Sequence, residues 1–218
     1  MRKINKNPPP AALLTYVQQV GASFDDMDAD VKDEVKRSLL NEQRWVCGYC
    51  QQVISDETRM KIEHFCEQSI CDGSDGRDDR RLDYTNMMAV CLGNSGSQLH
   101  CDSHKAKFNA QNGLPIEVSP WIQAHMDRIQ YSSSGMISST NARHNNELNI
   151  ILNLNIPRLK DLRRKKITAI YRLSKHSNNA QETAKRKRIL ERDIAYSNNK
   201  FANSFPGVSE FMLKRLNR

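Results

Sequence analysis

The sequence lacks a long apolar run, a recognisable secretion signal and an internal repeat. No stretch of about 18 consecutive apolar residues is present, which argues against a transmembrane helix. The charged residues 1–6 are followed by Pro8, Pro9 and Pro10, where a signal peptide would need an apolar segment. We therefore expect a cytoplasmic protein. Because only 38% of its residues are hydrophobic, its core is limited.

Cysteine is also sparse, and its expected use follows from the compartment. Six cysteines in a cytoplasmic chain indicate metal binding or chemistry before disulfide bonds. No thioredoxin-like βαβ pattern surrounds the turn Cys47-Gly48-Tyr49-Cys50, which disfavours a redox protein.

The net charge of +8 is divided unevenly along the 218 residues. Residues 141–218 carry 18 Lys and Arg against 6 Asp and Glu, a balance of +12. This leaves 15 against 19, a balance of −4, for residues 1–140. A basic surface attracts phosphate backbones, although solvated helix faces would have the same composition. The acidic half suits a site built from metal-binding carboxylates.

The hydrophobic pattern predicts an α+β protein that is mostly helical. Val31, Val35 and Leu39 recur at helical spacing in a helix that ends near Trp45, with Asp residues at 25–28 as candidate N-caps. Two strands are expected over 59–65 and 86–91, separated by a polar loop, and a helix over 101–109 follows a flexible loop at 93–98. This order is a ββα arrangement.

The cysteines around this ββα unit fit a structural zinc site. Zinc prefers four ligands in a tetrahedron, and a C-x-x-C turn supplies two of them. The predicted ligands are Cys47, Cys50, Cys91 and Cys101. The gap within the second pair is wide, so His100 is a possible substitute, Cys66 and Cys71 are competitors, and buried free thiols are the alternative. Because a site closed by four cysteines has no open position, catalysis needs a second centre.

Glu63 and His64 provide that candidate centre at the end of the first strand. Neighbouring strand side chains point to opposite faces, so both reach one site only if the strand ends or bends there. Histidine can take a proton from water near neutral pH. Asp102 can offer a hard oxygen ligand to Mg²⁺. Taken alone, a Glu-His pair is often an ordinary surface feature.

These motifs resemble the HNH endonuclease superfamily and, more closely, the PtuB-type HNH nuclease subunits of Septu and retron-associated anti-phage systems. The resemblance covers most of the chain. It is carried by residues 1–6, Cys47-Gly-Tyr-Cys50, Ile62-Glu-His-Phe65, Leu82-Asp-Tyr-Thr-Asn86, His100-Cys-Asp102 with Lys105, and Ile151-Leu-Asn-Leu-Asn155.

The resemblance implies a role for each matching position. His64 matches the general base, and Asn86 matches the middle residue, which orients the base or touches the metal. Glu63 matches an acidic metal ligand, and Asp102 stands where many members have their last histidine. His104, two residues later, is the alternative ligand. The expected domains are a helical lead over 1–45, a zinc-stapled ββα-metal core over 46–115 and a basic, mainly helical region over 116–218.

The implied activity is metal-dependent hydrolysis of phosphodiester bonds, with Zn²⁺ as the structural ion and Mg²⁺ or another divalent cation as the catalytic one. DNA is the favoured substrate, and RNA such as tRNA is the other. Expected phosphate contacts are Lys105, Lys107, Arg163, Arg164 and Lys165, although exposed helix lysines need have no such role.

The implied partners are an SMC/ABC-like ATPase of the PtuA type and, in retrons, a reverse transcriptase with its RNA–DNA product. The basic region can hold nucleic acid or dock on a partner, and the sequence does not separate the two. The alternative function is an inactive, zinc-stabilised nucleic-acid-binding module of the same complex.

Overall fold

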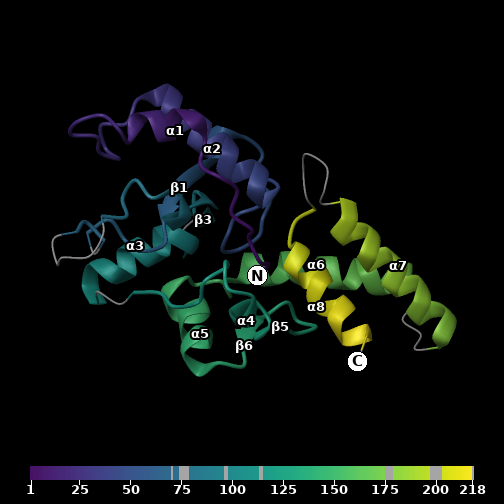
Figure 1. The fold of residues 1–218 in the computed structure, drawn as a ribbon. Coiled ribbons are helices and arrows are strands. Elements are labelled where there is room, and N and C mark those ends of the chain that lie inside the picture. Colours follow the sequence, from purple (N-terminus) through teal and green to yellow (C-terminus); the bar gives the residue numbers. More distant parts are fainter. Residues whose placement is uncertain are drawn as a thin grey trace.

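The computed structural model describes residues 1–69, 71–73, 79–95, 98–112, 115–174, 179–196 and 203–217. About half of the chain is helical, and the strands form three small antiparallel sheets of two strands each (Figure 1). The fold is thus α+β, as the hydrophobic pattern predicted. None of the helices within these residues has the length and apolarity needed to cross a membrane.

The N-terminal part places two helices against the central sheet. They are α1 (Ala11–Tyr16) and α2 (Ala29–Gln43), and α2 confirms the predicted amphipathic helix. Asp28 occupies its N-cap position, but its side chain makes no capping hydrogen bond. The buried Gln43 amide donates to Val46 O and Ala89 O and accepts from Ala89 N, so it joins α2 to the sheet.

The central part consists of two strands followed by a helix. Strand β1 (Met60–His64) pairs antiparallel with β2 (Met87–Cys91), and Glu63 lies opposite Met88. Helix α3 (Cys101–Asn112) packs against β2, and short 3₁₀ turns, η1 (Glu57–Arg59) and η2 (Tyr84–Asn86), precede the two strands. We call the turn formed by residues 47–50 the knuckle. The predicted order of knuckle, strand, strand and helix is therefore present. Within the expected flexible loop at 93–98, β3 (Asn94–Ser95) pairs antiparallel with β4 (Gln98–Leu99), and residues 96 and 97 lie outside the described residues.

Two glycines lie at close approaches around this unit, Gly48 to a side chain and Gly93 to the backbone. A Cβ at Gly48 would lie 2.7 Å from Met88 Sδ, so the knuckle packs directly on β2. Gly93 has φ +68°, and a Cβ there would lie 2.3 Å from His100 O. Glycine tolerates both situations because it has no side chain.

The C-terminal part begins with a small α/β unit and ends with three helices. Its elements are α4 (Gln123–Met126), β5 (Ile129–Tyr131), β6 (Ile137–Ser139), α5 (Ala142–Asn146), the π-helical η3 (Glu147–Ile151), α6 (Pro157–Leu173), α7 (Ala180–Tyr196) and α8 (Pro206–Leu216). Pro157 is the first residue of α6, where its fixed φ suits the first helical turn. The basic run at 185–188 lies within α7.

Arg163 connects this C-terminal part internally. The side chain is 1% exposed, and its guanidinium donates to Gly135 O, Leu154 O and Asn155 Oδ1 at 2.7, 2.7 and 3.0 Å. A buried arginine is tolerated when its donors are satisfied in this way. Arg163 is consequently not presented to nucleic acid, and this corrects its expected role.

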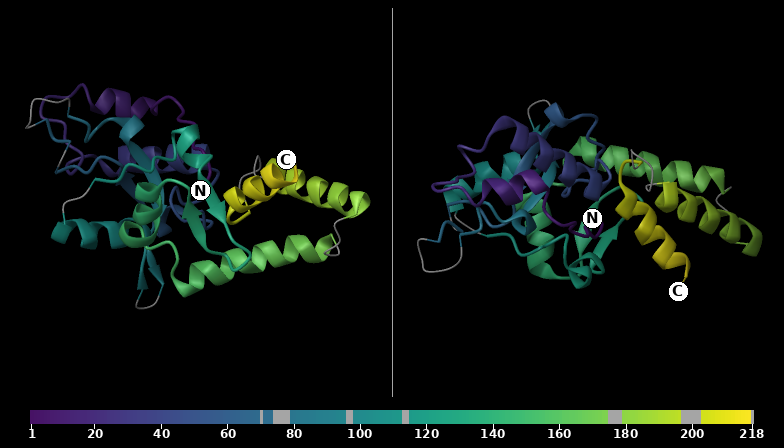
Figure 2. Two further views of the ribbon diagram at one scale, coloured as in Figure 1. Left: turned by 90° about the horizontal axis from the view of Figure 1, so that it is seen from below. Right: turned by 45° about the horizontal axis from the view of Figure 1, so that its top comes forward.

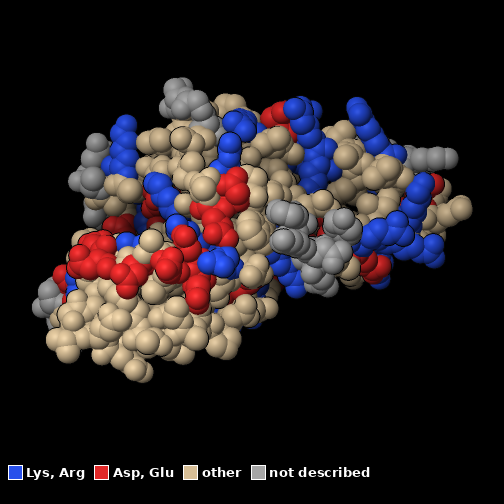
Figure 3. All heavy atoms as spheres, turned by 90° about the horizontal axis from the view of Figure 1, so that it is seen from above, with Lys and Arg blue, Asp and Glu red and all other residues tan. Residues whose placement is uncertain are grey.

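The helices α6, α7 and α8 form one end of the molecule, and α1, α2 and α3 form the other (Figures 1 and 2). The two ends meet near the knuckle, where Gln51 O accepts from Phe205 N and Gln51 Oε1 accepts from Gly207 N. On the face shown in Figure 3, acidic side chains gather over the α1–α2 end, and Lys and Arg gather towards the α6–α8 end. The uneven distribution of charge along the sequence thus gives an uneven distribution of charge on this face of the molecule.

Candidate functional site

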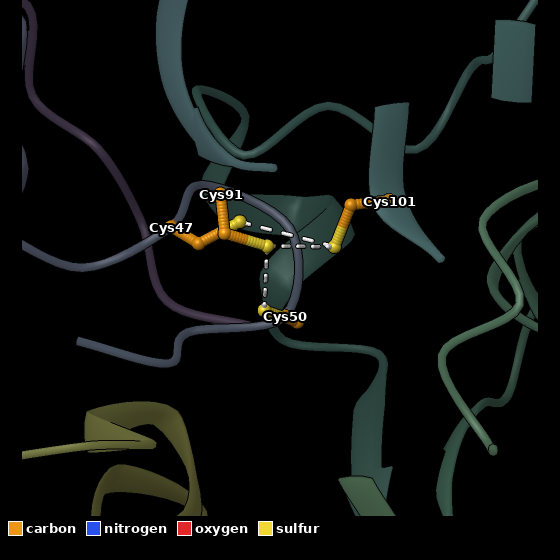
Figure 4. A group of neighbouring side chains, drawn as sticks. All are labelled: Cys47, Cys50, Cys91 and Cys101. Carbon is orange, nitrogen blue, oxygen red and sulfur yellow. Dashed lines mark hydrogen bonds between the residues drawn. The ribbon is translucent and has the colours of Figure 1, made fainter. Parts of the chain in front are cut away.

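Four thiols converge where the knuckle, the end of β2 and the start of α3 meet (Figure 4). The Sγ atoms of Cys47 and Cys101 are 3.9 Å apart, those of Cys50 and Cys91 are 3.7 Å apart, and those of Cys91 and Cys101 are 3.8 Å apart. We call these four residues the thiol cluster. A tetrahedral ion with metal–sulfur bonds of about 2.3 Å would separate its sulfurs by about 3.8 Å. The cluster therefore has the composition and the spacing to hold a metal ion.

Protons and a metal ion would compete for the sulfurs of the thiol cluster. Burial raises the pKa of the Cys50 and Cys101 thiols, whereas donation from the neighbouring thiols lowers the pKa of Cys91. A metal would replace these competing protons by binding all four thiolates. His100 is buried beside the cluster with Nδ1 3.2 Å from Cys101 Sγ, but it is not needed to complete the set of four.

Cys66 and Cys71 do not compete for this cluster. They are joined by a disulfide, with their Cα atoms 6.0 Å apart in a turn where Cys71 N donates to Glu67 O. The expectation that the cysteines serve metal binding or chemistry before disulfides is wrong for this pair. Its physical reason is local, because the turn brings both residues within bridging distance.

A separate groove of about 550 Å³ lies beside the end of β1 and the first turns of α3. Glu63 and His64 both line it, together with Asp102 and Lys105. The strand ends at His64, and this resolves the problem that adjacent strand side chains normally point to opposite faces. The groove thus brings together three of the four residues expected in the catalytic centre.

His64 is held by a backbone carbonyl and an aromatic ring. Its Nε2 lies 2.8 Å from Arg81 O, and Phe24 packs edge-on with its centroid 4.4 Å away. A carbonyl oxygen only accepts, so Nε2 carries the hydrogen and Nδ1 of the neutral ring carries the lone pair. Burial lowers the pKa of His64, and the nearby Lys105 charge adds to this lowering. The imidazole is therefore neutral at pH 7 and can accept a proton.

Glu63 is the most enclosed carboxyl group of the groove. Its Oε1 accepts a hydrogen bond from Tyr49 Oη at 2.8 Å and is ion-paired with Lys105 Nζ. Burial raises the pKa of Glu63 to about 8, the Lys105 charge opposes this, and the neighbouring Asp102 carboxylate adds to it. Two carboxylates this close favour either a shared proton or a bound cation. Their chemistry thus fits a divalent metal.

Asn86 is fully enclosed and lies outside the groove. Its Oδ1 accepts from Cys66 N at 2.8 Å, and its Nδ2 donates to Cys66 O at 3.0 Å and Arg80 O at 3.1 Å. These contacts fix the segment after His64 and the segment before Arg81, whose carbonyl binds the imidazole. Its position is that of a residue that orients His64 and not of a metal ligand.

Asp102 and His104 leave α3 in different directions. Asp102 lines the groove and pairs with Lys61 Nζ at 3.3 Å. His104 Nδ1 lies 2.8 Å from Ile151 O, so this ring is directed towards η3. The structure therefore brings Asp102 to Glu63 and does not bring His104, which removes the alternative ligand.

The expected phosphate contacts differ in their accessibility. Lys105 is 2% exposed and is engaged by Glu63 and His64 O, so it belongs to the groove wall. Lys107 is exposed on α3, and Arg164 and Lys165 are exposed on α6, where both pair with Asp161. Of the five expected phosphate contacts, only Lys107, Arg164 and Lys165 are exposed and can contact a nucleic acid on the surface.

Sequence reasoning missed two contributors to the groove. Tyr49 lies inside the C-x-x-C turn, where attention goes to the cysteines, and its contact with Glu63, 14 residues away, has no signal in the sequence. The contact between Arg81 O and His64 has no signal in the sequence, because every residue has a backbone carbonyl.

A second set of metal-ligand types, Glu117, His125 and His144, lies outside the groove. His144 Nε2 is 3.3 Å from Glu117 Oε1, Arg143 pairs with Glu117 Oε2 at 2.9 Å, and Ser119 N donates to His125 Nδ1 at 3.2 Å. Because these groups already engage one another and neighbouring protein groups, we assign no metal to this set.

Comparison with known proteins supports the family resemblance. No family model matches the chain. Over 130 residues it is 29% identical to "Retron Ec83 putative HNH endonuclease" of Escherichia coli, a match that covers 52% of this chain and 49% of that protein. The chain thus spans about half the length of the curated relative it matches. This similarity supports both the HNH motif and the link to retrons.

Proposed function

We propose that the chain is a metal-dependent HNH endonuclease that hydrolyses phosphodiester bonds in nucleic acid. The observation that carries this proposal is the neutral His64, fixed through Nε2 by Arg81 O beside a groove that Glu63 and Asp102 also line. A fixed imidazole with a free lone pair and a carboxylate pair beside it is the equipment of a metal-assisted hydrolase.

In the proposed reaction, His64 Nδ1 accepts a proton from a water molecule that attacks phosphorus in line. The new P–O bond forms as the bond to the leaving 3′-oxygen breaks. Glu63 and Asp102 would hold Mg²⁺ or another divalent cation, which would stabilise the charge that develops on the phosphoryl and leaving oxygens. Asn86 keeps the imidazole oriented through the loop that it binds.

We further propose that zinc occupies the thiol cluster and has a structural role. The sulfur separations of 3.7–3.9 Å support this, since they equal those of a tetrahedral zinc–thiolate site to within about 0.2 Å. All four positions would be filled by protein, so no coordination site would remain for a substrate.

The test uses the purified full chain with supercoiled plasmid DNA and, separately, tRNA, each with Mg²⁺ or Mn²⁺. Replacing His64 with alanine should reduce the cleavage rate by at least about 100-fold, because general-base catalysis contributes about 10²–10⁴. His104→Ala is the matched control and should retain cleavage, since that ring lies outside the groove. Cleavage by the His64 variant at the wild-type rate would refute the assignment. DNA is the substrate we favour.

We also propose that the chain is the toxic effector of a retron or Septu-type anti-phage complex. The retron origin stated for the relative supports this context. The proposed nuclease core is 46–115, and the basic region 116–218 would bind nucleic acid or a partner. The partners we propose are an SMC/ABC-like ATPase of the PtuA type and a retron reverse transcriptase with its RNA–DNA product.

This role can be tested in cells that carry the complete defence system. Protection against phage should be lost with His64→Ala although the protein still accumulates. If the variant protects as well as the wild type, the chain instead acts as a zinc-stabilised binding module without catalysis.

A further inference from the structure

Tyr49 connects the thiol cluster to the candidate active site. The side chain is completely buried, and its hydroxyl donates to Glu63 Oε1 at 2.8 Å. Tyr49 is not among the residues that line the groove, so it cannot touch a substrate there. Any effect on the chemistry must pass through Glu63.

The backbone that carries Tyr49 is fixed on both sides. Cys47 and Cys50 belong to the thiol cluster, Gly48 N donates to Ala89 O at 2.9 Å, and Gln51 N donates to Cys47 O at 3.0 Å. The knuckle also touches the sheet at Met88, the residue opposite Glu63 in the strand register. The phenol therefore projects from a rigid turn and not from a mobile loop.

The two donors that reach Glu63 share one of its oxygens. Tyr49 Oη and Lys105 Nζ both donate to Oε1, and the Asp102 carboxyl group lies within hydrogen-bonding reach of the Glu63 side chain. A carboxylate held in this way presents one defined oxygen to a cation. Without the hydroxyl, Oε1 would keep a single hydrogen-bond donor, Lys105 Nζ.

We propose that Tyr49 is a positioning residue that orients the Glu63 carboxylate for the divalent cation of the groove. Through this hydroxyl group, the turn that carries Cys47 and Cys50 acts on the Glu63 carboxylate. This inference rests on the proposed nuclease function, because it assigns the cation to Glu63 and Asp102. Outer-shell partners of this kind change metal affinity by about 10- to 100-fold when they are removed.

The experiment measures Mn²⁺ binding to the purified full chain from the electron paramagnetic resonance signal of free Mn²⁺. Tyr49→Phe keeps the ring and removes only the hydroxyl, and it should raise the Kd for Mn²⁺ by about 10- to 100-fold. Zinc content should stay at the wild-type value. In plasmid cleavage, the Mn²⁺ concentration for half-maximal rate should rise by the same factor.

Tyr84→Phe is the matched control. Tyr84 is also buried, but its hydroxyl binds Ser38 and Glu42, two residues of α2. This variant should leave the Mn²⁺ affinity unchanged. In addition, Tyr49→Phe should have no further effect in a Glu63→Ala background, because two changes that act through one interaction are not additive.

The possible outcomes separate this inference from the proposed function. If Tyr49→Phe binds Mn²⁺ as the wild type does, the positioning role is wrong, even if the protein is a nuclease. Loss of zinc from Tyr49→Phe would also overturn it, since the hydroxyl would then serve the knuckle itself. If Mn²⁺ binding weakens as expected but no wild-type cleavage is found, the positioning role holds and the nuclease assignment fails.

Discussion

Replacing Asn86 with aspartate is the change that most directly tests how the loop around His64 is held. The amide is 1% exposed and makes three hydrogen bonds, two through Nδ2 and one through Oδ1. Aspartate has the same shape and keeps the acceptor, but it replaces the Nδ2 donor with an oxygen that faces the carbonyls of Cys66 and Arg80. Two hydrogen bonds become contacts between acceptors.

The expected loss of stability follows from these contacts. Losing two hydrogen bonds costs about 1 kcal/mol each, and leaving the buried acceptors without donors adds about 1–3 kcal/mol. We expect Asn86→Asp to lower the free energy of unfolding by about 3–5 kcal/mol at pH 7. The cleavage rate should fall as well, because Arg80 is followed by the residue whose carbonyl holds His64.

The pH dependence of the variant gives a stricter test. Burial, together with the carbonyl oxygens that face the second carboxyl oxygen, should raise the pKa of the new carboxyl group above its unfolded value, because both favour the neutral form. The loss in the free energy of unfolding should therefore become smaller as the pH falls towards 4, where the protonated carboxyl group regains a donor. It should become larger as the pH rises. Urea denaturation at several pH values measures this. Asn5→Asp, at an exposed position, should show neither effect.

The reasoning about Asn86 would be refuted by a variant as stable as the wild type at pH 7. It would also be refuted by a loss of stability that is independent of pH. In either case the buried amide would not be what secures the loop.

Four further outcomes are expected. The cleavage rate should fall at acid pH with a midpoint below 6.5, because burial lowers the pKa of His64 and the protonated ring cannot accept a proton; a pH–rate profile checks this. A strong zinc chelator should unfold the chain in thermal melts followed by circular dichroism, since structural zinc contributes about 10–16 kcal/mol against a typical total stability of about 5–15 kcal/mol. Arg163→Met should destabilise the fold by about 3 kcal/mol with the salt dependence of nucleic-acid binding unchanged. Arg164→Ala should change the free energy of unfolding by no more than about 0.5 kcal/mol, because this side chain is exposed. If α6 contacts phosphates, the same variant should reduce the slope of log binding constant against log salt concentration by about 1.

The parts of the fold that could be predicted are those with a strong local pattern. The helical spacing of apolar residues located α2, and the motif order located β1, β2 and α3. The C-x-x-C turn identified half of the thiol cluster and made Cys91 and Cys101 the natural completion. For the helices, the strands and the C-x-x-C turn, the sequence pattern and the structural element occupy the same few residues, whereas the thiol cluster joins residues 41 and 54 positions apart.

The parts that could not be predicted depend on partners distant in sequence. Basic side chains are ordinarily exposed, so Lys105 and Arg163 were expected to meet phosphates. Their burial depends on Glu63 and on the carbonyls of Gly135 and Leu154, and backbone carbonyls leave no trace in the sequence. The hydrogen bond between His64 Nε2 and Arg81 O could not be predicted for the same reason.

The sequence also suggested two independent centres, a thiol cluster for folding and a separate polar set for catalysis. The structure links them through the register of one pair of strands. Met88 lies opposite Glu63 and packs on Gly48, while Tyr49 donates to the Glu63 carboxylate. A shift of the knuckle must therefore move the carboxylate or break its hydrogen bond. Substitutions of the cysteines consequently cannot be interpreted as purely structural, and the hydroxyl of Tyr49 is the point at which the two effects can be separated.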